Sequence, residues 1–249
     1  LLITYVLFSS AGYPLSNNNY LNSHQIRVSE KVSDSLIMQK ALEAEILVKS
    51  QEYKKAAEIY FDISLKTEDP EIAKRATQLA GYAKDYKLML KSSDRWLKIA
   101  EDKIPVRHIR ISIFLAQNKV ELATKETLSA IKFSKDKDKF ALVYDTLKVF
   151  DDEIIALIFE KIYAEYKNEY LASFYYVQVL LNNNAYEKAI NLINQASKFE
   201  EFNKRESRWG IFLAKAYFEL GKDDLSVKIL KEYLSYSPKD VYLNQYYGN

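Results

Sequence analysis

The chain has 249 residues, of which 48% are hydrophobic and 28% are charged, so it can bury a large apolar interior as a folded protein. Its 36 basic and 34 acidic side chains leave a formal charge of +2, which gives no strong electrostatic reason to expect nucleic acid or an acidic membrane as the main partner. The chain contains no cysteine, which excludes disulfides, thiol catalysis and cysteine metal sites. Only 5 glycines and 4 prolines leave few turn residues for an all-β architecture, so we expect an all-α fold.

The first residues resemble the end of a secretory signal. Leu1 to Phe8 is mostly apolar, and the small residues Ser9 to Gly12 follow. We interpret residues 1–12 as a signal-peptide remnant and expect an exported, periplasmic or envelope-associated protein; a cytoplasmic protein with a locally packed N-terminus is the alternative. A lipid anchor is not supported, because Tyr13 stands where a lipid-carrying cysteine would be needed. No stretch supplies the roughly 20 apolar residues of a membrane span.

Residues 13–33 contain Pro14 and the run Asn17 to Asn19, which favour turns, and we expect them to form a linker. A helical domain is expected over residues 34–249. Its first helix is predicted to begin at residue 33, 34 or 35, where serine and aspartate are good N-caps.

The next helix boundaries are set by Gln51 and Pro70. Apolar residues recur at three- and four-residue intervals up to a bend predicted near Gln51, as in an amphipathic helix. A second helix is predicted to end before Asp69, because a residue that precedes proline disfavours the α conformation.

This pair of helices is the first of a series of repeats. Similar patterns of small and aromatic residues recur about every 34 residues, with copies that begin near residues 37, 70, 104, 137, 170 and 207. The sixth copy is the clearest and contains Ala214, Tyr217, Gly221, Ser226, Leu230, Tyr233 and Pro238. Small residues let the two helices of a hairpin approach each other, and tyrosine and leucine fill the gap to the next hairpin. The second and fourth copies follow the pattern least well.

The pattern resembles the tetratricopeptide repeat (TPR) over about four fifths of the chain. This resemblance implies a right-handed α-solenoid of about six helix hairpins and a non-catalytic scaffold or adaptor that binds proteins or peptides. The stretch Asp69 to Ala76, followed by Trp96, resembles the opening repeats of exported bacterial TPR proteins, many of which are lipoproteins. That likeness implies a role in the bacterial cell envelope, including that of an adaptor for a periplasmic protease.

In the TPR family the first helix of each repeat lines a concave groove. The corresponding residues of this chain include His108, Ser112, Phe174, Gln178, Asn182, Arg208, Lys215 and Phe218, with Glu45 and Lys49 in the first copy. Aromatic rings supply buried area at such a surface, and amide and cationic side chains fix the orientation of a partner. The alternative, in which Phe174 and Phe218 pack between repeats, stays open.

The cluster of Arg107, His108 and Arg110 also has two interpretations. Its guanidinium groups are suited to hold an acidic segment or a phosphate, or else they are surface charges paired with nearby carboxylates.

Nothing in the sequence builds a catalytic motif. His24 and His108 lie far apart, and the glycines form no phosphate-binding loop. The pairs Asp151 with Asp152 and Glu200 with Glu201 are interpreted as solvated turn residues and helix caps. We therefore expect no enzyme, no cofactor and no metal site. Protein or peptide binding is the leading expectation and self-association is the alternative, while an enzyme and a nucleic-acid-binding protein are remote.

Overall fold

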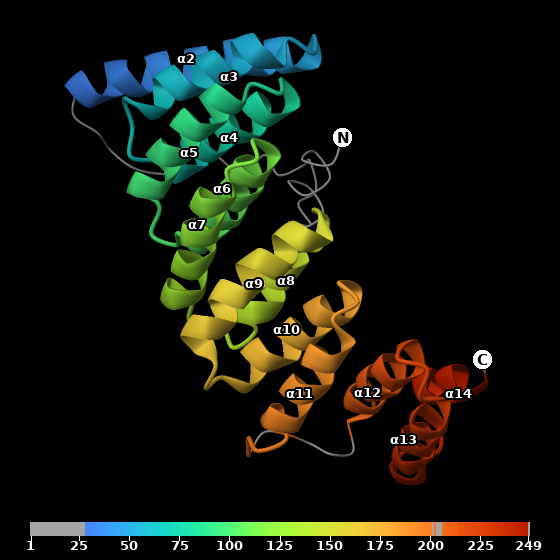
Figure 1. Ribbon diagram of the computed structural model, residues 1–249. Coiled ribbons are helices and arrows are strands. Elements are labelled where there is room, and N and C mark those ends of the chain that lie inside the picture. The colour runs from blue at the N-terminus through green and yellow to red at the C-terminus, as the bar shows by residue number, and fades with distance from the viewer. Residues whose placement is uncertain (1–27, 201, 203–205, 249) are drawn as a thin grey trace. The chain divides into compact units, whose positions relative to one another are not determined.

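The structure is a computed structural model that describes residues 28–200, 202 and 206–248 (Figure 1). These residues form thirteen helices joined by turns and contain no strand, which confirms the predicted all-α class. The chain divides into two compact units, residues 1–139 and 140–249, which are described separately. None of the helices in the described ranges is long and apolar enough to span a bilayer. The proposed signal remnant and most of the proposed linker lie outside the described residues.

The first unit contains three successive helix hairpins (Figure 1). They are formed by α2 (Val28–Lys49) with α3 (Tyr53–Ser64), α4 (Pro70–Tyr82) with α5 (Tyr86–Ile99), and α6 (Ile104–Ala116) with α7 (Val120–Phe133). Each helix packs against the next one along the chain from α2 to α7. The second helix ends at Ser64, which is before Asp69 as predicted, and Pro70 opens α4, where its missing N–H costs no hydrogen bond.

The start of α2 differs from the prediction. The helix begins at Val28, before the predicted caps at residues 33–35, so residues 28–33 are helical and do not belong to a linker. No glycine or proline occurs between Val28 and Ser35, so nothing in the backbone prevents the helix from extending past these polar residues.

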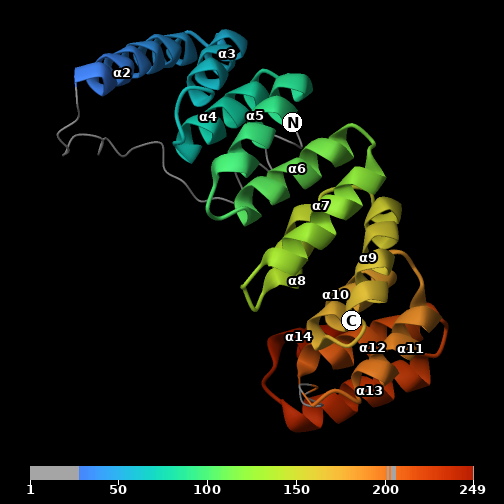
Figure 2. The same cartoon turned by 90° about the vertical axis from the view of Figure 1, so that its left-hand side faces the viewer.

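The second unit contains three further hairpins and a last helix. These are α8 (Lys139–Leu147) with α9 (Asp152–Tyr166), α10 (Tyr170–Asn182) with α11 (Tyr186–Ala196), α12 (Ser207–Glu219) with α13 (Asp223–Tyr236), and α14 (Val241–Gly248). Figures 1 and 2 show α10 beside α11 and α12 beside α13, and α10 also packs against α12. Of the repeat starts predicted from the second copy onward, those at 70, 104, 170 and 207 are confirmed; the fourth copy starts at Lys139 instead of 137.

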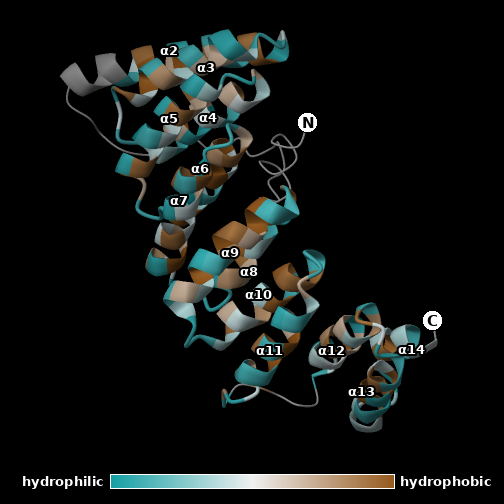
Figure 3. Ribbon diagram, in the orientation of Figure 1, coloured by the Kyte–Doolittle hydropathy of each residue, from teal (hydrophilic) through white to brown (hydrophobic). Residues whose placement is uncertain are grey.

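The small residues of the repeat are buried within the helix hairpins. Ala44, Ala56, Ala123, Ala189 and Ala214 are all at most 1% exposed, as the sequence predicts. Figure 3 shows the resulting alternation of hydrophobic and hydrophilic residues along the helices of each hairpin.

One backbone conformation recurs in the turns between paired helices. Gln51, Lys84, Asn118, Asn184 and Gly221 all have φ between 55° and 69°, and each occupies the same position in its repeat. The next residue in each turn donates its N–H to a carbonyl five residues earlier, as Asp85 does to Ala80 (2.9 Å) and Lys222 to Tyr217 (2.9 Å). This is the Schellman ending of a helix, so the hairpin turn is set by the backbone, and glycine occupies it only once.

The fourth hairpin breaks this rule. No residue of its turn, 148–151, has a positive φ, and the side chain of Asp151 caps α9 by accepting hydrogen bonds from the N–H groups of Glu153 (3.0 Å) and Ile154 (3.4 Å). Large rings separate the two helices of this hairpin: Phe140 packs against Tyr166, and Tyr144 packs against Phe159 at 6.0 Å between ring centroids. The weak fourth copy in the sequence thus corresponds to a hairpin with a different turn and packing.

Candidate functional site

In the first unit, the predicted groove residue Glu45 is occupied by contacts within the protein. Its carboxylate accepts a hydrogen bond from the Tyr60 hydroxyl (2.8 Å) and two from Arg75, from Nε (3.0 Å) and from a terminal nitrogen (3.1 Å). Burial and the Glu45 carboxylate raise the pKa of Tyr60. Because Arg75 lies on α4, this network ties the first hairpin to the second and has a structural role.

His108 and Ser112 do not form the exposed pair that the sequence predicts. Ser112 is fully buried, and its hydroxyl donates to the His108 carbonyl (3.2 Å) of its own helix. A partner therefore cannot reach Ser112, and this part of the prediction is wrong. His108 is half-buried, and burial lowers its pKa to about 4 against the opposing charge of Asp102. His108 is consequently uncharged at neutral pH.

The neighbouring arginines are paired with carboxylates, as the second of the two interpretations of this cluster proposes, but the pairs do not lie on the surface as that interpretation expects. Arg107 contacts Glu126 at 2.6 Å, and Arg110 contacts both Asp94 and Glu126. The Arg107, Arg110 and Glu126 side chains are only 11–14% exposed, so these ion pairs are not surface charges. These ion pairs link α5, α6 and α7. Glu126 compensates the positive charge of Arg107 and Arg110, which would otherwise attract an anion.

In the second unit, Phe174 belongs to the core. It is 3% exposed, and its ring lies edge-on to Trp209, with 5.2 Å between the ring centroids. The Trp209 indole N–H donates to the Tyr170 hydroxyl (2.8 Å), which fixes both rings between α10 and α12. Phe174 could have lined the groove or packed between repeats, and the structure shows that it packs between repeats. It therefore cannot contact a partner directly.

The remaining candidates lie on the two neighbouring first helices, α10 and α12. Asn182 and Arg208 are exposed, Gln178 and Lys215 are half-buried, and Phe218 is 62% exposed. The ring of Phe218, in contrast to that of Phe174, is not packed between repeats and is accessible at the surface. Together these residues provide an aromatic ring, two cations and two amides, which is the combination expected of a peptide-binding surface.

Arg208 is also supported by the core. Its guanidinium lies 4.5 Å from the centroid of the Phe174 ring, and it is paired with Glu206. The cation–π contact holds the guanidinium over the buried ring. The buried Phe174 therefore positions an exposed neighbour, although it is not itself a contact residue.

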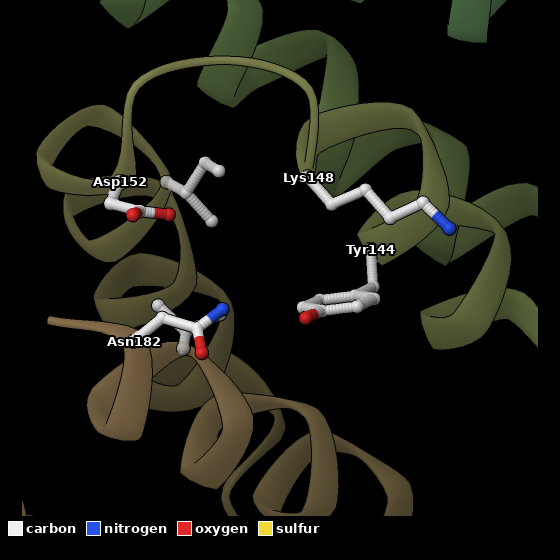
Figure 4. Close-up of a pocket in the computed structure, with 6 residues that line it drawn as sticks. Tyr144, Lys148, Asp152 and Asn182 are labelled. Carbon is white, nitrogen blue, oxygen red and sulfur yellow. The ribbon is translucent and has the colours of Figure 1, made fainter.

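A shallow pocket adjoins Asn182 at the irregular fourth hairpin (Figure 4). It is lined by Tyr144 and Lys148 near the end of α8, Asp152 and Ile155 of α9, and Val179 and Asn182 of α10. Next to the pocket, the Asn183 amide donates to the backbone carbonyls of Asp152 and Val179, both at 3.0 Å, and so links α10 to the start of α9. Burial is the main reason that the pKa of Tyr144 is raised, so its hydroxyl stays protonated at neutral pH.

The groove positions predicted only one of these six residues, Asn182. Tyr144 and Lys148 were not predicted because the fourth copy departs from the repeat, so that repeat positions do not identify them. Asp152 was predicted to be a solvated turn residue. The departure itself was the available signal, since the turn carries Asp151 and the following helix starts with two acidic residues, Asp152 and Glu153. Among the described residues, no group of carboxylate and histidine side chains is arranged to hold a metal ion.

No protein-family model matches the sequence, and no curated protein is significantly similar to it. Solved structures with similar folds include YrrB, described as a TPR protein with an unusual peptide-binding site, at 12% identity and a TM-score of 0.44, covering 76% of this chain and 97% of YrrB. The C-terminal part of a TPR repeat-containing protein from Cytophaga hutchinsonii is similar at 14% identity and a TM-score of 0.45, covering 83% of each chain. The TPR domain of P58(IPK) is similar at 14% identity and a TM-score of 0.35, covering 85% of this chain and 63% of that domain.

These similarities are too distant to assign a function. The fold assignment rests on the chain's own geometry, which combines paired helices, a constant repeat length and a recurring Schellman turn. The described residues form an array of tetratricopeptide-like helix hairpins.

Proposed function

We propose that this protein is a non-catalytic scaffold or adaptor that binds a protein partner along α10 and α12 of its second unit. The observation that carries the proposal is the position of Phe218, a large ring that is 62% exposed on the same helix as Arg208 and Lys215. A rigid aromatic beside cations on a packed helix face can supply buried area and orientation together. The amides of Gln178 and Asn182 on α10 extend this surface.

Site-specific crosslinking in the native cell tests the proposal. A photoreactive residue at Phe218, and another at Lys215, are expected to capture the same partner. The matched control is a photoreactive residue at Val227, which is 41% exposed but lies on α13, the second helix of the same hairpin. Identical adducts at all three positions, or no adduct at Phe218 and Lys215, would contradict binding along α10 and α12.

We further propose that this binding takes place in the bacterial cell envelope, where the protein serves as an adaptor for a periplasmic protease. The support is the signal-like pattern of residues 1–12 and the resemblance of Asp69 to Ala76 to exported TPR proteins. Fractionation of cells that contain the crosslinked complex tests the location. A protease in the periplasmic fraction is expected among the adducts, whereas a cytosolic partner in a cytosolic complex would overturn this placement.

Self-association is the alternative function, and one feature of α2 favours it. Ile46 on α2 is 59% exposed, whereas Leu79, Ile113 and Val179, which occupy the same repeat position in α4, α6 and α10, are at most 2% exposed. A helix in front of α2 in a second copy would cover Ile46 in the way that the preceding hairpin covers Leu79. Under this alternative, sedimentation shows a concentration-dependent mass that Ile46→Glu abolishes and Lys215→Glu leaves unchanged.

A further inference from the structure

The pocket beside Asn182 has a size and a chemistry that indicate which part of a partner it takes. The space between its lining residues is about 210 Å³ when the open solvent at its mouth is included, so it is a shallow depression that does not enclose a small molecule. Such a depression is suited to the end of a single side chain from a partner that lies on the surface.

The polar groups of the pocket face a common space. Figure 4 shows the Asp152 carboxylate, the Asn182 amide and the Tyr144 hydroxyl directed toward the centre of the pocket, while the Lys148 amine extends away from Asp152. The floor is apolar, because Ile155 is 3% exposed and Val179 is 2% exposed. The pocket thus joins hydrogen-bonding groups at its wall to an apolar surface beneath them.

The charges around the pocket favour a cation. Lys148 is paired with Asp145 at 2.6 Å, so its charge is already compensated. Asp152 is the first residue of α9 and is followed by Glu153, and no ion pair or hydrogen bond to its carboxylate is found within the described part of the chain. A group that enters the pocket therefore meets a carboxylate that is available for a charge-assisted hydrogen bond.

The Tyr144 ring is held in place for such a group. It packs against Phe159 at 6.0 Å and Tyr175 at 5.4 Å between ring centroids, so its position is fixed from two sides. A planar guanidinium stacks on an aromatic ring and donates several hydrogen bonds in a fixed fork, which an ammonium cannot do. The Asn182 amide nitrogen faces the Tyr144 hydroxyl and is hydrogen-bonded to it, which also holds the ring. A fixed ring beside a carboxylate matches the guanidinium group better than any other side-chain cation.

We propose that this pocket binds one arginine side chain of the protein partner, with Asp152 as the hydrogen-bond acceptor, Tyr144 as the stacking surface and Asn182 holding the Tyr144 hydroxyl in place. The proposal rests on the proposed function, because the arginine belongs to a segment that lies along α10. It adds a specificity-determining contact at the irregular fourth hairpin, which the repeat pattern does not assign.

Oriented peptide libraries applied to the immobilised full chain test this proposal. Each pool carries one fixed residue among randomised neighbours, and the fixed residue is arginine, lysine, citrulline or glutamate. Citrulline has nearly the shape of arginine without its charge, so comparing these two pools separates charge from fit. The arginine pool is expected to bind roughly tenfold more tightly than the citrulline pool, as a hydrogen bond to a charged group implies.

Two variants of α9 make the test specific to the pocket. Asp152→Asn is expected to remove the preference for arginine, whereas Glu153→Gln removes the same charge from the same helical turn, outside the pocket lining, and is expected to keep the preference. Asn182→Ala is expected to weaken the preference several-fold. Equal binding of the arginine and citrulline pools, an arginine preference that survives Asp152→Asn, or an equal loss in both α9 variants would each overturn the proposal.

The outcome is separable from that of the proposed function. If Phe218 and Lys215 crosslink to a partner whose affinity is unchanged by Asp152→Asn, the scaffold function stands and the arginine pocket fails. If neither position crosslinks, the proposed function itself fails, whichever pool the libraries select.

Discussion

Gly210 on α12 lies against the ring of Tyr233 on α13, and this ring fills the space that a side chain at position 210 would need. A Cβ atom placed on Gly210 would lie 2.7 Å from Cδ1 and 2.8 Å from Cδ2 of Tyr233, closer than real contacts allow. Tyr233 is 6% exposed and cannot swing out of the way without leaving the core. The sixth hairpin is therefore packed as closely as a glycine permits.

We expect Gly210→Ala to destabilise the protein. Overpacking costs about 1–3 kcal/mol, and the better helix propensity of alanine recovers up to about 1 kcal/mol of this, so a net loss of about 1–2 kcal/mol is expected in urea unfolding. The control is the same substitution in a Tyr233→Leu background, where the ring is gone and alanine is expected to be neutral or stabilising. Equal losses in both backgrounds would show that the ring is not the cause.

The recurring left-handed turn predicts that Lys84→Gly stabilises the first unit. Lys84 has φ 55°, a conformation that costs a side chain about 1–2 kcal/mol and costs glycine little. Glycine also loses more conformational entropy on folding, which offsets part of this gain. We therefore expect the free energy of unfolding, obtained from the urea midpoint, to rise by roughly 0.5–1 kcal/mol. Asn118→Gly is the comparison, because asparagine tolerates this region and should gain less. A loss of stability in Lys84→Gly would contradict this account of the turn.

The buried ion pairs of the first unit predict unequal effects of two similar substitutions. Glu126→Gln leaves Arg107 without a charged partner and Arg110 with Asp94 alone in a nearly buried site, and we expect a loss of about 3 kcal/mol. Glu68→Gln removes the partner of Arg95, but the Glu68 side chain is 81% exposed, so a loss below about 1 kcal/mol is expected. Comparable losses, measured by chemical unfolding of both variants at neutral pH, would argue against burial as the deciding factor.

His108 predicts a dependence of stability on pH. Burial lowers its folded-state pKa to about 4, below its ordinary value of 6.5, so the unfolded chain takes up a proton first as the pH falls. The free energy of unfolding should therefore decrease as the pH is lowered from about 6.5 toward 4. His108→Gln removes this titration, and we expect the variant to lose less stability than the wild type between pH 7 and pH 5. An identical pH dependence in both proteins would mean that His108 is not protonated on unfolding in this range.

The sequence by itself determined the hairpins and their spacing. Amphipathic helices show their period in the apolar residues, and small residues such as Ala189 and Ala214 have to recur wherever two helices cross closely. The repeat starts at residues 70, 104, 170 and 207 followed from these local rules. The start of α2 could not be predicted from these rules, because polar residues without glycine or proline do not mark where a helix begins.

Only the tertiary structure decided which side chains a partner can reach. Repeat position treats Phe174 and Phe218 alike, yet one is packed against Trp209 and the other is exposed, because burial depends on the neighbouring hairpin. Asp151 and Asp152 look equivalent in the sequence, but the first caps α9 and the second lines a pocket. Tyr144, Asp152 and Asn182 come from three helices, and their meeting depends on packing between helices that no local pattern records.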